Sequence, residues 1–145
     1  MGVDESPVTF EGCRPWTKPS DAYEPELLDG RILHFHDMNL LKIEIEPELR
    51  QLTLWFEWDP DYLPDPFRDA PLARLDLQRA RVVDWDDEPV EHLPPGVGRE
   101  VHGLDFYPPN LLHFQSYNVT FTAKFRRVVL TVLPADSLRR HDLGC

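Results

Sequence analysis

The amino-acid sequence predicts an all-β protein, an antiparallel β-sandwich or barrel-like domain of about six to eight short strands with little helix. Two observations carry this prediction. From Arg31 onward, apolar and polar residues alternate with the period of two that is typical of half-buried strands. The alternating runs are separated by polar or proline-rich segments of hairpin length, and the sequence has neither a βαβ pattern nor a glycine-rich phosphate loop.

The first part of the chain is expected to be an irregular arm. We assign residues 1–29 to this N-terminal arm and residues 30–145 to a single β domain, because 145 residues fit one domain. Prolines interrupt any helix in the arm, whereas Trp16 and Tyr23 are candidates to attach it to the domain. The segment PELLDG predicts one helical turn that ends at Gly30.

The clearest early element is a β-hairpin over residues 39–58. Ile43 and Ile45 alternate with glutamates, and the run QLTLWFEW follows after the short polar turn EPELR. One face of this second run carries Leu52, Leu54, Phe56 and Trp58. Residues 59–71 contain four prolines and four aspartates and therefore predict a surface loop.

The next run, LARLDLQRARVVDW at 72–85, can place its apolar residues on one face. These residues are Ala73, Leu75, Leu77, Val83 and Trp85. Because QRARV breaks the alternation, we expect either a bulge or two short strands. A second proline-rich acidic loop follows at 86–98, and then a short strand, VHGLDFY, that ends at the Pro108-Pro109 turn.

The last third predicts two further runs. HFQSYNVTFTAKF is interpreted as a strand whose inward residues are Tyr117, Val119, Phe121, Ala123 and Phe125. RRVVLTVL is a strong strand, with Arg126-Arg127 marking the turn or bulge before it. PADSLRRHDLG is expected to finish as a helical turn capped by Asp136.

Charge and cysteine content restrict the class of function. Fifteen Lys and Arg against 26 Asp and Glu give a net charge of −11, which argues against partners that are nucleic acids or anionic membranes. The sequence has only two cysteines, and its N-terminus lacks a basic start followed by an apolar stretch. We therefore expect a cytoplasmic location and no cofactor.

His34 and His36 form an HxH pair that suggests a metal site. On a strand, both imidazoles would lie on one face and could share a metal ion. A third ligand is missing, because the glycine and glutamate spacing of a cupin motif is absent around the pair. The hypothesis we favour is that the two histidines flank the start of a strand, with Asp37 bonded to a backbone amide there. The alternative is a small metal-dependent β-barrel enzyme, or a ligand-binding protein, that uses His34 and His36.

The acidic loops suggest a non-catalytic binding role. Aromatic side chains within an anionic rim are what an interface for a basic protein partner requires, although such acids are often merely solvated. No nucleophile motif supports catalysis. The candidate partner-binding residues are Asp84, Trp85, Asp86, Asp87, Glu88 and Glu91 in the segment that leads into the second loop, and Asp61, Tyr62 and Asp65 in the first loop.

The order of these segments between Phe35 and Pro134 resembles small β-rich bacterial immunity proteins of polymorphic toxin systems, particularly the family called immunity protein fifty. In that family a His-Asp pair opens the first strand, a strand of the type vtLrF…v lies in the middle of the chain, and a strand with an aromatic residue precedes the last strand. The matching positions here would be His36-Asp37, the run ARLDLQRARV and Phe125. The resemblance implies a cytoplasmic immunity protein that binds and neutralises a cognate toxin domain without catalysis.

Overall fold

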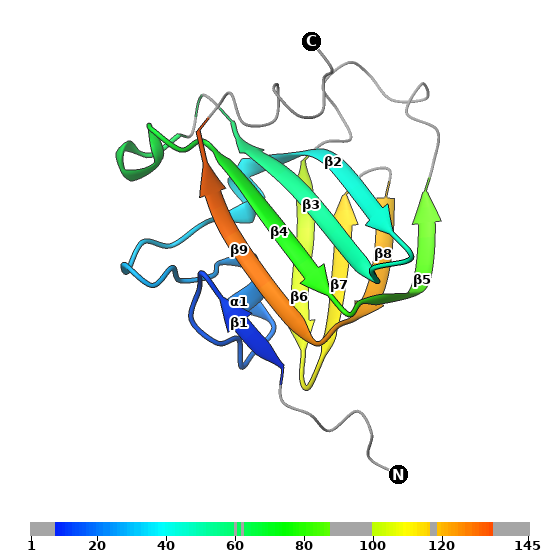
Figure 1. The fold of residues 1–145 in the computed structure, drawn as a ribbon. Helices are drawn as coiled ribbons and strands as arrows, with labels where there is room; N and C mark the ends of the chain where they lie inside the picture. Colours follow the sequence, from blue (N-terminus) through cyan, green and yellow to red (C-terminus); the bar gives the residue numbers. More distant parts are fainter. Residues whose placement is uncertain (1–7, 60, 62, 88–99, 117–118, 135–145) are drawn as a thin grey trace.

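The computed structural model describes residues 8–59, 61, 63–87, 100–116 and 119–134, and these residues form nine strands in two sheets (Figure 1). The five-stranded sheet has the order β1-β9-β4-β3-β2, with strands Thr9–Glu11 (β1), Met38–Glu46 (β2), Gln51–Trp58 (β3), Leu72–Gln78 (β4) and Arg127–Leu133 (β9). The four-stranded sheet has the order β5-β8-β7-β6, with strands Arg81–Asp87 (β5), Val101–Tyr107 (β6), Leu111–Ser116 (β7) and Val119–Lys124 (β8). The two sheets form a sandwich-like arrangement and not a closed barrel, so the predicted all-β fold class is confirmed.

Helix is confined to short pieces in the described residues. These are α1 (Ser20–Tyr23) and the 3-10 turns η2 (Phe35–Asp37) and η4 (Asp65–Phe67). No helix in this part of the chain has both the length and the apolar character needed to cross a lipid bilayer.

Aromatic side chains join the two sheets. The Phe56 ring on β3 lies 4.6 Å from the ring of Phe35 and 6.3 Å from that of Phe114 on β7. Phe121 on β8 continues this contact at 5.3 Å from Phe114. All four rings are buried, as alternation of inward residues along each strand requires.

The predicted hairpin at 39–58 is formed by β2 and β3, and its inward residues on β3 are buried as expected. Trp55 on the opposite face is also buried. Its Nε1 donates a hydrogen bond of 2.6 Å to Glu44, and the guanidinium of Arg74 lies 5.4 Å from its ring. Long polar side chains therefore cover the outer face of this sheet around Trp55.

The segment 72–85 forms two strands, the second of the two expected alternatives. Leu75 and its alternating neighbours on β4 face the core, but the chain turns at Arg79 and β5 joins the other sheet. Val83, which we expected to align with them, falls at a register shift between β5 and β8 and is exposed. Trp85 sits at the margin of the sandwich, 38% exposed and stacked on Phe121 at 5.6 Å.

The run at 113–125 is a correction, because it is a hairpin and not one strand. β7 and β8 pair antiparallel on either side of residues 117–118, which lie outside the described residues. Phe121, Ala123 and Phe125 are buried as predicted. The buried positions change from even-numbered residues on β7 to odd-numbered residues on β8, so Ser116, which was expected to point outward, is buried. The helical turn expected near Asp136 also lies outside the described residues.

The N-terminal arm packs on the domain through β1 and Trp16. β1 pairs parallel with β9, and Gly12 directly after it has a φ of +85°. A Cβ at Gly12 would lie 2.0 Å from the carbonyl oxygen of Leu130, so only glycine allows this close approach. The Trp16 ring is buried 5.3 Å from Phe10 and 5.7 Å from Phe106. The helical turn expected at 25–30 is instead a turn closed by a bond from the Gly30 amide to the Leu27 carbonyl.

Four chain reversals lie at the same end of the sandwich, drawn at the lower end of Figure 1. They are the β2–β3 turn at residues 47–50, the β4–β5 connection at 79–80, the β6–β7 turn at 108–110 and the β8–β9 turn at 125–126. Antiparallel pairing within each sheet brings them together, because every strand that enters this end must leave it. The loop at 59–71 lies at the opposite end of β3 and β4.

Candidate functional site

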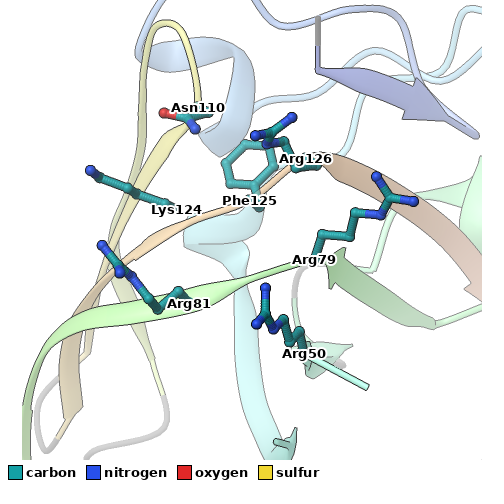
Figure 2. A pocket seen from close by; sticks show the side chains of 7 residues that line it. All are labelled: Arg50, Arg79, Arg81, Asn110, Lys124, Phe125 and Arg126. Carbon is teal, nitrogen blue, oxygen red and sulfur yellow. The ribbon is translucent and has the colours of Figure 1, made fainter. Parts of the chain in front are cut away.

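The four reversals enclose a hollow that is lined mainly by cationic side chains, which we call the basic cleft. Its volume is about 490 Å³, in the range of small-molecule sites. Its lining consists of Arg50, Arg79, Arg81, Asn110, Lys124, Phe125 and Arg126. Figure 2 shows these side chains arranged around the hollow, with the Phe125 ring among them.

Backbone hydrogen bonds hold the turns of the basic cleft together. The Ala80 amide donates to the Arg50 carbonyl at 2.6 Å, which joins the β4–β5 connection to the β2–β3 turn. The Phe125 amide donates to the Asn110 carbonyl at 3.1 Å, which joins the two remaining turns. The side chains of the cleft are thus mounted on turns fixed to one another, and Phe125 anchors them in the core with 1% of its surface exposed.

Two of the arginines lie in the left-handed region of backbone conformation. Arg50 and Arg79 both have a φ of +51°, and they are the only described residues other than glycine with a positive φ. This conformation costs a non-glycine residue about 1–2 kcal/mol. Residues held in such conformations cluster at functional sites, where the surrounding structure maintains them. Both strained arginines of the described chain line the same hollow.

The charge of the basic cleft is opposite to that of the whole protein. Five of the 15 Lys and Arg line it, although the net charge is −11. Within the part of the chain that the structure describes, no ion pair forms with Arg50, Arg79, Arg81 or Lys124. The described lining contains no carboxylate, and it contains no His or Cys to transfer a proton near neutral pH. The arrangement is therefore suited to binding an anion.

A second hollow, which we call the apolar groove, adjoins the basic cleft. It has a volume of about 430 Å³ and shares Arg50, Arg79 and Arg81 with the cleft. The remainder of its lining is mostly apolar and consists of Ile45, Glu46, Pro47, Gln51, Leu52, Ala80 and Val82. The groove lies where β2 and β3 of one sheet face β5 of the other.

The acidic residues predicted to bind a partner are divided between two places. Asp84, Trp85 and Asp86 are exposed on β5, which is the outermost strand of its sheet among the described residues. Asp61 and Asp65 are exposed in the loop at the opposite end of β3 and β4. Tyr62, Glu88, Glu91 and the side chain of Asp87 lie outside what the structure describes.

The histidine pair does not lie on a strand. His34 precedes η2 and His36 lies within it, so the buried Phe35 separates two imidazoles that contact different carboxylates. His34 Nδ1 is 3.1 Å from Glu24, and His36 Nε2 is 3.0 Å from Asp37. No group of three or more potential metal ligands occurs among the described residues. The expected bond from Asp37 to a backbone amide is replaced by this contact with the His36 ring.

The carboxylates around this turn also act on Tyr23. Its ring lies 6.0 Å from the His36 ring, and its hydroxyl donates a bond of 3.3 Å to the Val101 carbonyl. Burial, together with the negative charges of Asp37 and neighbouring carboxylates, raises the pKa of Tyr23. This tyrosine is consequently a neutral donor that ties the arm to β6.

A polar cluster on the outer face of the five-stranded sheet is internally satisfied. Asp76, buried on β4, accepts hydrogen bonds from the Thr53 hydroxyl at 2.6 Å and the Gln51 amide at 3.1 Å. Arg74 Nε is 3.1 Å from its other oxygen. Because both carboxylate oxygens of Asp76 have protein partners, this cluster stabilises the sheet surface.

Comparisons of the chain with protein-family models, with curated proteins and with solved structures find no match. The resemblance to immunity proteins therefore remains a prediction. Of its matching positions, His36-Asp37 lie in η2, and Phe125 lies at the basic cleft after β8.

Sequence reasoning did not identify the basic cleft. In the sequence, QRARV indicates only a break in alternation, and Arg126-Arg127 indicates only a turn or bulge. The signal that could have found the site is that its arginines and lysine all fall at strand ends. If the strand order had been known, those ends would have been placed together.

Proposed function

We propose that this protein binds a small, multiply charged anion of the phosphate class in the basic cleft. The observation that carries the proposal is the gathering of four arginines and one lysine around one hollow in a protein with a net charge of −11. Guanidinium groups match the oxygens of phosphate with paired hydrogen bonds, which makes arginine the side chain best suited to this ligand.

The arrangement favours a compact dianion over an extended polyanion. The cations face one hollow at one end of the sandwich, and the protein as a whole would repel a long anionic polymer. A phosphate or pyrophosphate group fits the volume and can contact several guanidinium groups at once.

The direct test is calorimetric titration of the purified protein with inorganic pyrophosphate at low ionic strength. We expect saturable binding to one site that weakens as salt is added. Arg79→Gln should weaken binding about 10- to 100-fold, since a hydrogen bond to a charged group contributes about 1.5–3 kcal/mol.

Arg68→Gln is the matched control, because it removes the same charge from the loop at the opposite end of the strands, where Arg68 pairs with Asp65 at 2.9 Å. Its affinity should equal that of the unchanged protein. The proposal fails if pyrophosphate does not bind, or if Arg68→Gln and Arg79→Gln reduce affinity equally.

A second candidate function is the binding of a basic protein along β5, as an immunity protein would bind a toxin domain. Exposed Asp84 and Asp86 on an outer strand support it, because an outer strand can pair with another chain while carboxylates attract a basic one. The test is co-purification with the product of a neighbouring toxin-like gene. Asp84→Lys with Asp86→Lys should abolish capture, and Glu48→Lys, at an exposed turn residue outside both predicted loops, serves as the control for charge reversal alone. Unchanged capture by the double variant would remove β5 as the interface.

A further inference from the structure

The basic cleft and the apolar groove are bordered by the same three arginines, Arg50, Arg79 and Arg81. A ligand whose charged group contacts these guanidinium groups from the cleft therefore has the groove directly beside it. The two hollows are also similar in volume, so the groove can accept a substantial group and not only a solvent molecule.

The groove is an uncovered margin of the hydrophobic core. Ile45 and Leu52 are cross-strand partners on β2 and β3, so their side chains lie on the same face of the sheet. Leu52 is 1% exposed, whereas Ile45 at the rim is 50% exposed. Val82, which faces them from β5 in the other sheet, is partly buried against the same core. Apolar surface open to water beside a charged site is a common feature of ligand grooves.

We infer that the ligand is an organic phosphate ester whose apolar group lies in the groove while its phosphate lies in the basic cleft. This inference rests on the proposed function, because it takes the phosphate position as given. The charge of the arginines and the apolar character of the adjoining groove together specify an amphiphilic anion. An inorganic anion would leave the groove unfilled.

The ligand is a soluble ester and not a lipid within a membrane. Binding at an anionic bilayer would bring a protein of net charge −11 against a negative surface, which opposes approach. The exposed aspartates of β5 lie further along the strand whose first residues line the groove, and they add to this repulsion.

The experiment compares methyl, butyl and hexyl phosphate, which share one charged group and differ only in apolar length. Calorimetry at fixed low ionic strength gives the dissociation constant for each ester. We expect affinity to rise along the series by up to about fourfold for each methylene that becomes buried, from about 0.8 kcal/mol per methylene.

Two variants locate the apolar contact. Ile45→Gln should remove most of the dependence on chain length and leave the affinity for methyl phosphate unchanged. Leu49→Gln is the control, because Leu49 is an exposed apolar residue of the same turn, 69% exposed, that does not line the groove. It should behave like the unchanged protein, and both substitutions are at exposed positions that the core does not need.

The outcomes separate this inference from the proposed function. If methyl phosphate binds but longer esters bind no more tightly, the inference is wrong and the proposed function stands. If no ester binds but pyrophosphate does, the inference is wrong and the proposed function stands, whereas the proposed function fails as well if neither the esters nor pyrophosphate bind. A soluble ester is also the wrong ligand if vesicles that contain phosphatidic acid bind the protein more tightly than hexyl phosphate does in solution.

Discussion

Arg79 lies in the left-handed region, with a φ of +51°, and its replacement by glycine should stabilise the fold while weakening anion binding. Relief of the backbone strain contributes about 1–2 kcal/mol. The greater freedom of glycine in the unfolded chain costs roughly 0.5–1 kcal/mol. The net gain is about 0.5–1 kcal/mol, which corresponds to about 2–4 °C in Tm for a domain of this size.

Charge and strain can be separated with two further variants. Arg79→Gln removes the cation but keeps the strained backbone, so the difference in unfolding free energy between Arg79→Gly and Arg79→Gln gives the relief of strain minus the entropy cost of glycine. Arg81→Gly also removes a cation from the cleft, but Arg81 is not among the residues of positive φ, so that variant lacks the gain from strain relief.

Urea denaturation and calorimetric titration with pyrophosphate measure the two effects on the same samples. We expect Arg79→Gly to be the most stable of the three variants, and all three to bind pyrophosphate at least about tenfold more weakly. If Arg79→Gly is no more stable than Arg79→Gln, the strain of the left-handed conformation does not exceed the entropy cost of glycine, and the predicted net gain is refuted.

Three further predictions concern the arm and the core. Burial raises the pKa of Cys13 to about 11, so iodoacetamide should label this thiol far more slowly in the folded than in the urea-unfolded protein. Mass spectrometry can follow the labelling in a variant whose second cysteine is replaced by serine. Equal labelling rates in the two states would contradict this prediction. Burial raises the pKa of Asp21, but hydrogen bonds from Thr17 and Lys18 outweigh it and hold the pKa below its usual value. The ionised Asp21 therefore stabilises the folded form above the unfolded pKa, and this stability is lost as pH falls through the folded pKa. Asp21→Asn should lower the free energy of unfolding by about 0.5–1 kcal/mol at neutral pH and leave it unchanged in strong acid. Urea denaturation at both pH values measures the difference. Phe56→Ala should cost about 3–5 kcal/mol in guanidinium unfolding, because a fully buried ring that joins the sheets is lost; a cost below about 1 kcal/mol would show that the two sheets do not depend on it.

The parts of the fold that the sequence predicts well are those in which alternation and turn composition agree. The β2–β3 hairpin has alternating runs on both sides of the polar segment at 47–50, and both signals place the reversal there. The β7–β8 hairpin is hidden from a prediction that treats 113–125 as one run, because its only trace in the pattern is a one-residue change of phase, from buried even-numbered residues on β7 to buried odd-numbered residues on β8. Period alone carries no information on chain direction. β1 was missed for another reason, since three residues are too few for a pattern and its pairing depends on Gly12, which lets the chain approach Leu130.

The candidate site could not be predicted from the sequence, because its residues are close in space but do not form a sequence motif. Its cations are separated by as many as 76 positions, from Arg50 to Arg126, and each alone looks like a charged residue at the end of a strand. The HxH pair drew attention because its spacing is local, yet a 3-10 turn directs the two imidazoles to different carboxylates. The spacing of two residues in the sequence indicates a shared site only if the backbone conformation between them is known. The clustering of turns at one end of a sandwich, in contrast, follows from the strand order alone.

The position of the cations follows from the way the sandwich is built. Arginines scattered over an acidic surface would pair with nearby carboxylates. Residues 50, 79 and 126 instead lie in turns at the ends of strands, and the inward-facing neighbours on these strands are core residues. Phe125 and the backbone bonds between the turns supply the attachment, so the hydrophobic core opposes both the repulsion among the cations and the strain at two of them. Four of these cations form no ion pair with described residues, so their mutual repulsion is unfavourable in the protein without a ligand. An anion that neutralises it is therefore favoured electrostatically, and this is the reason to seek the ligand at this end of the molecule.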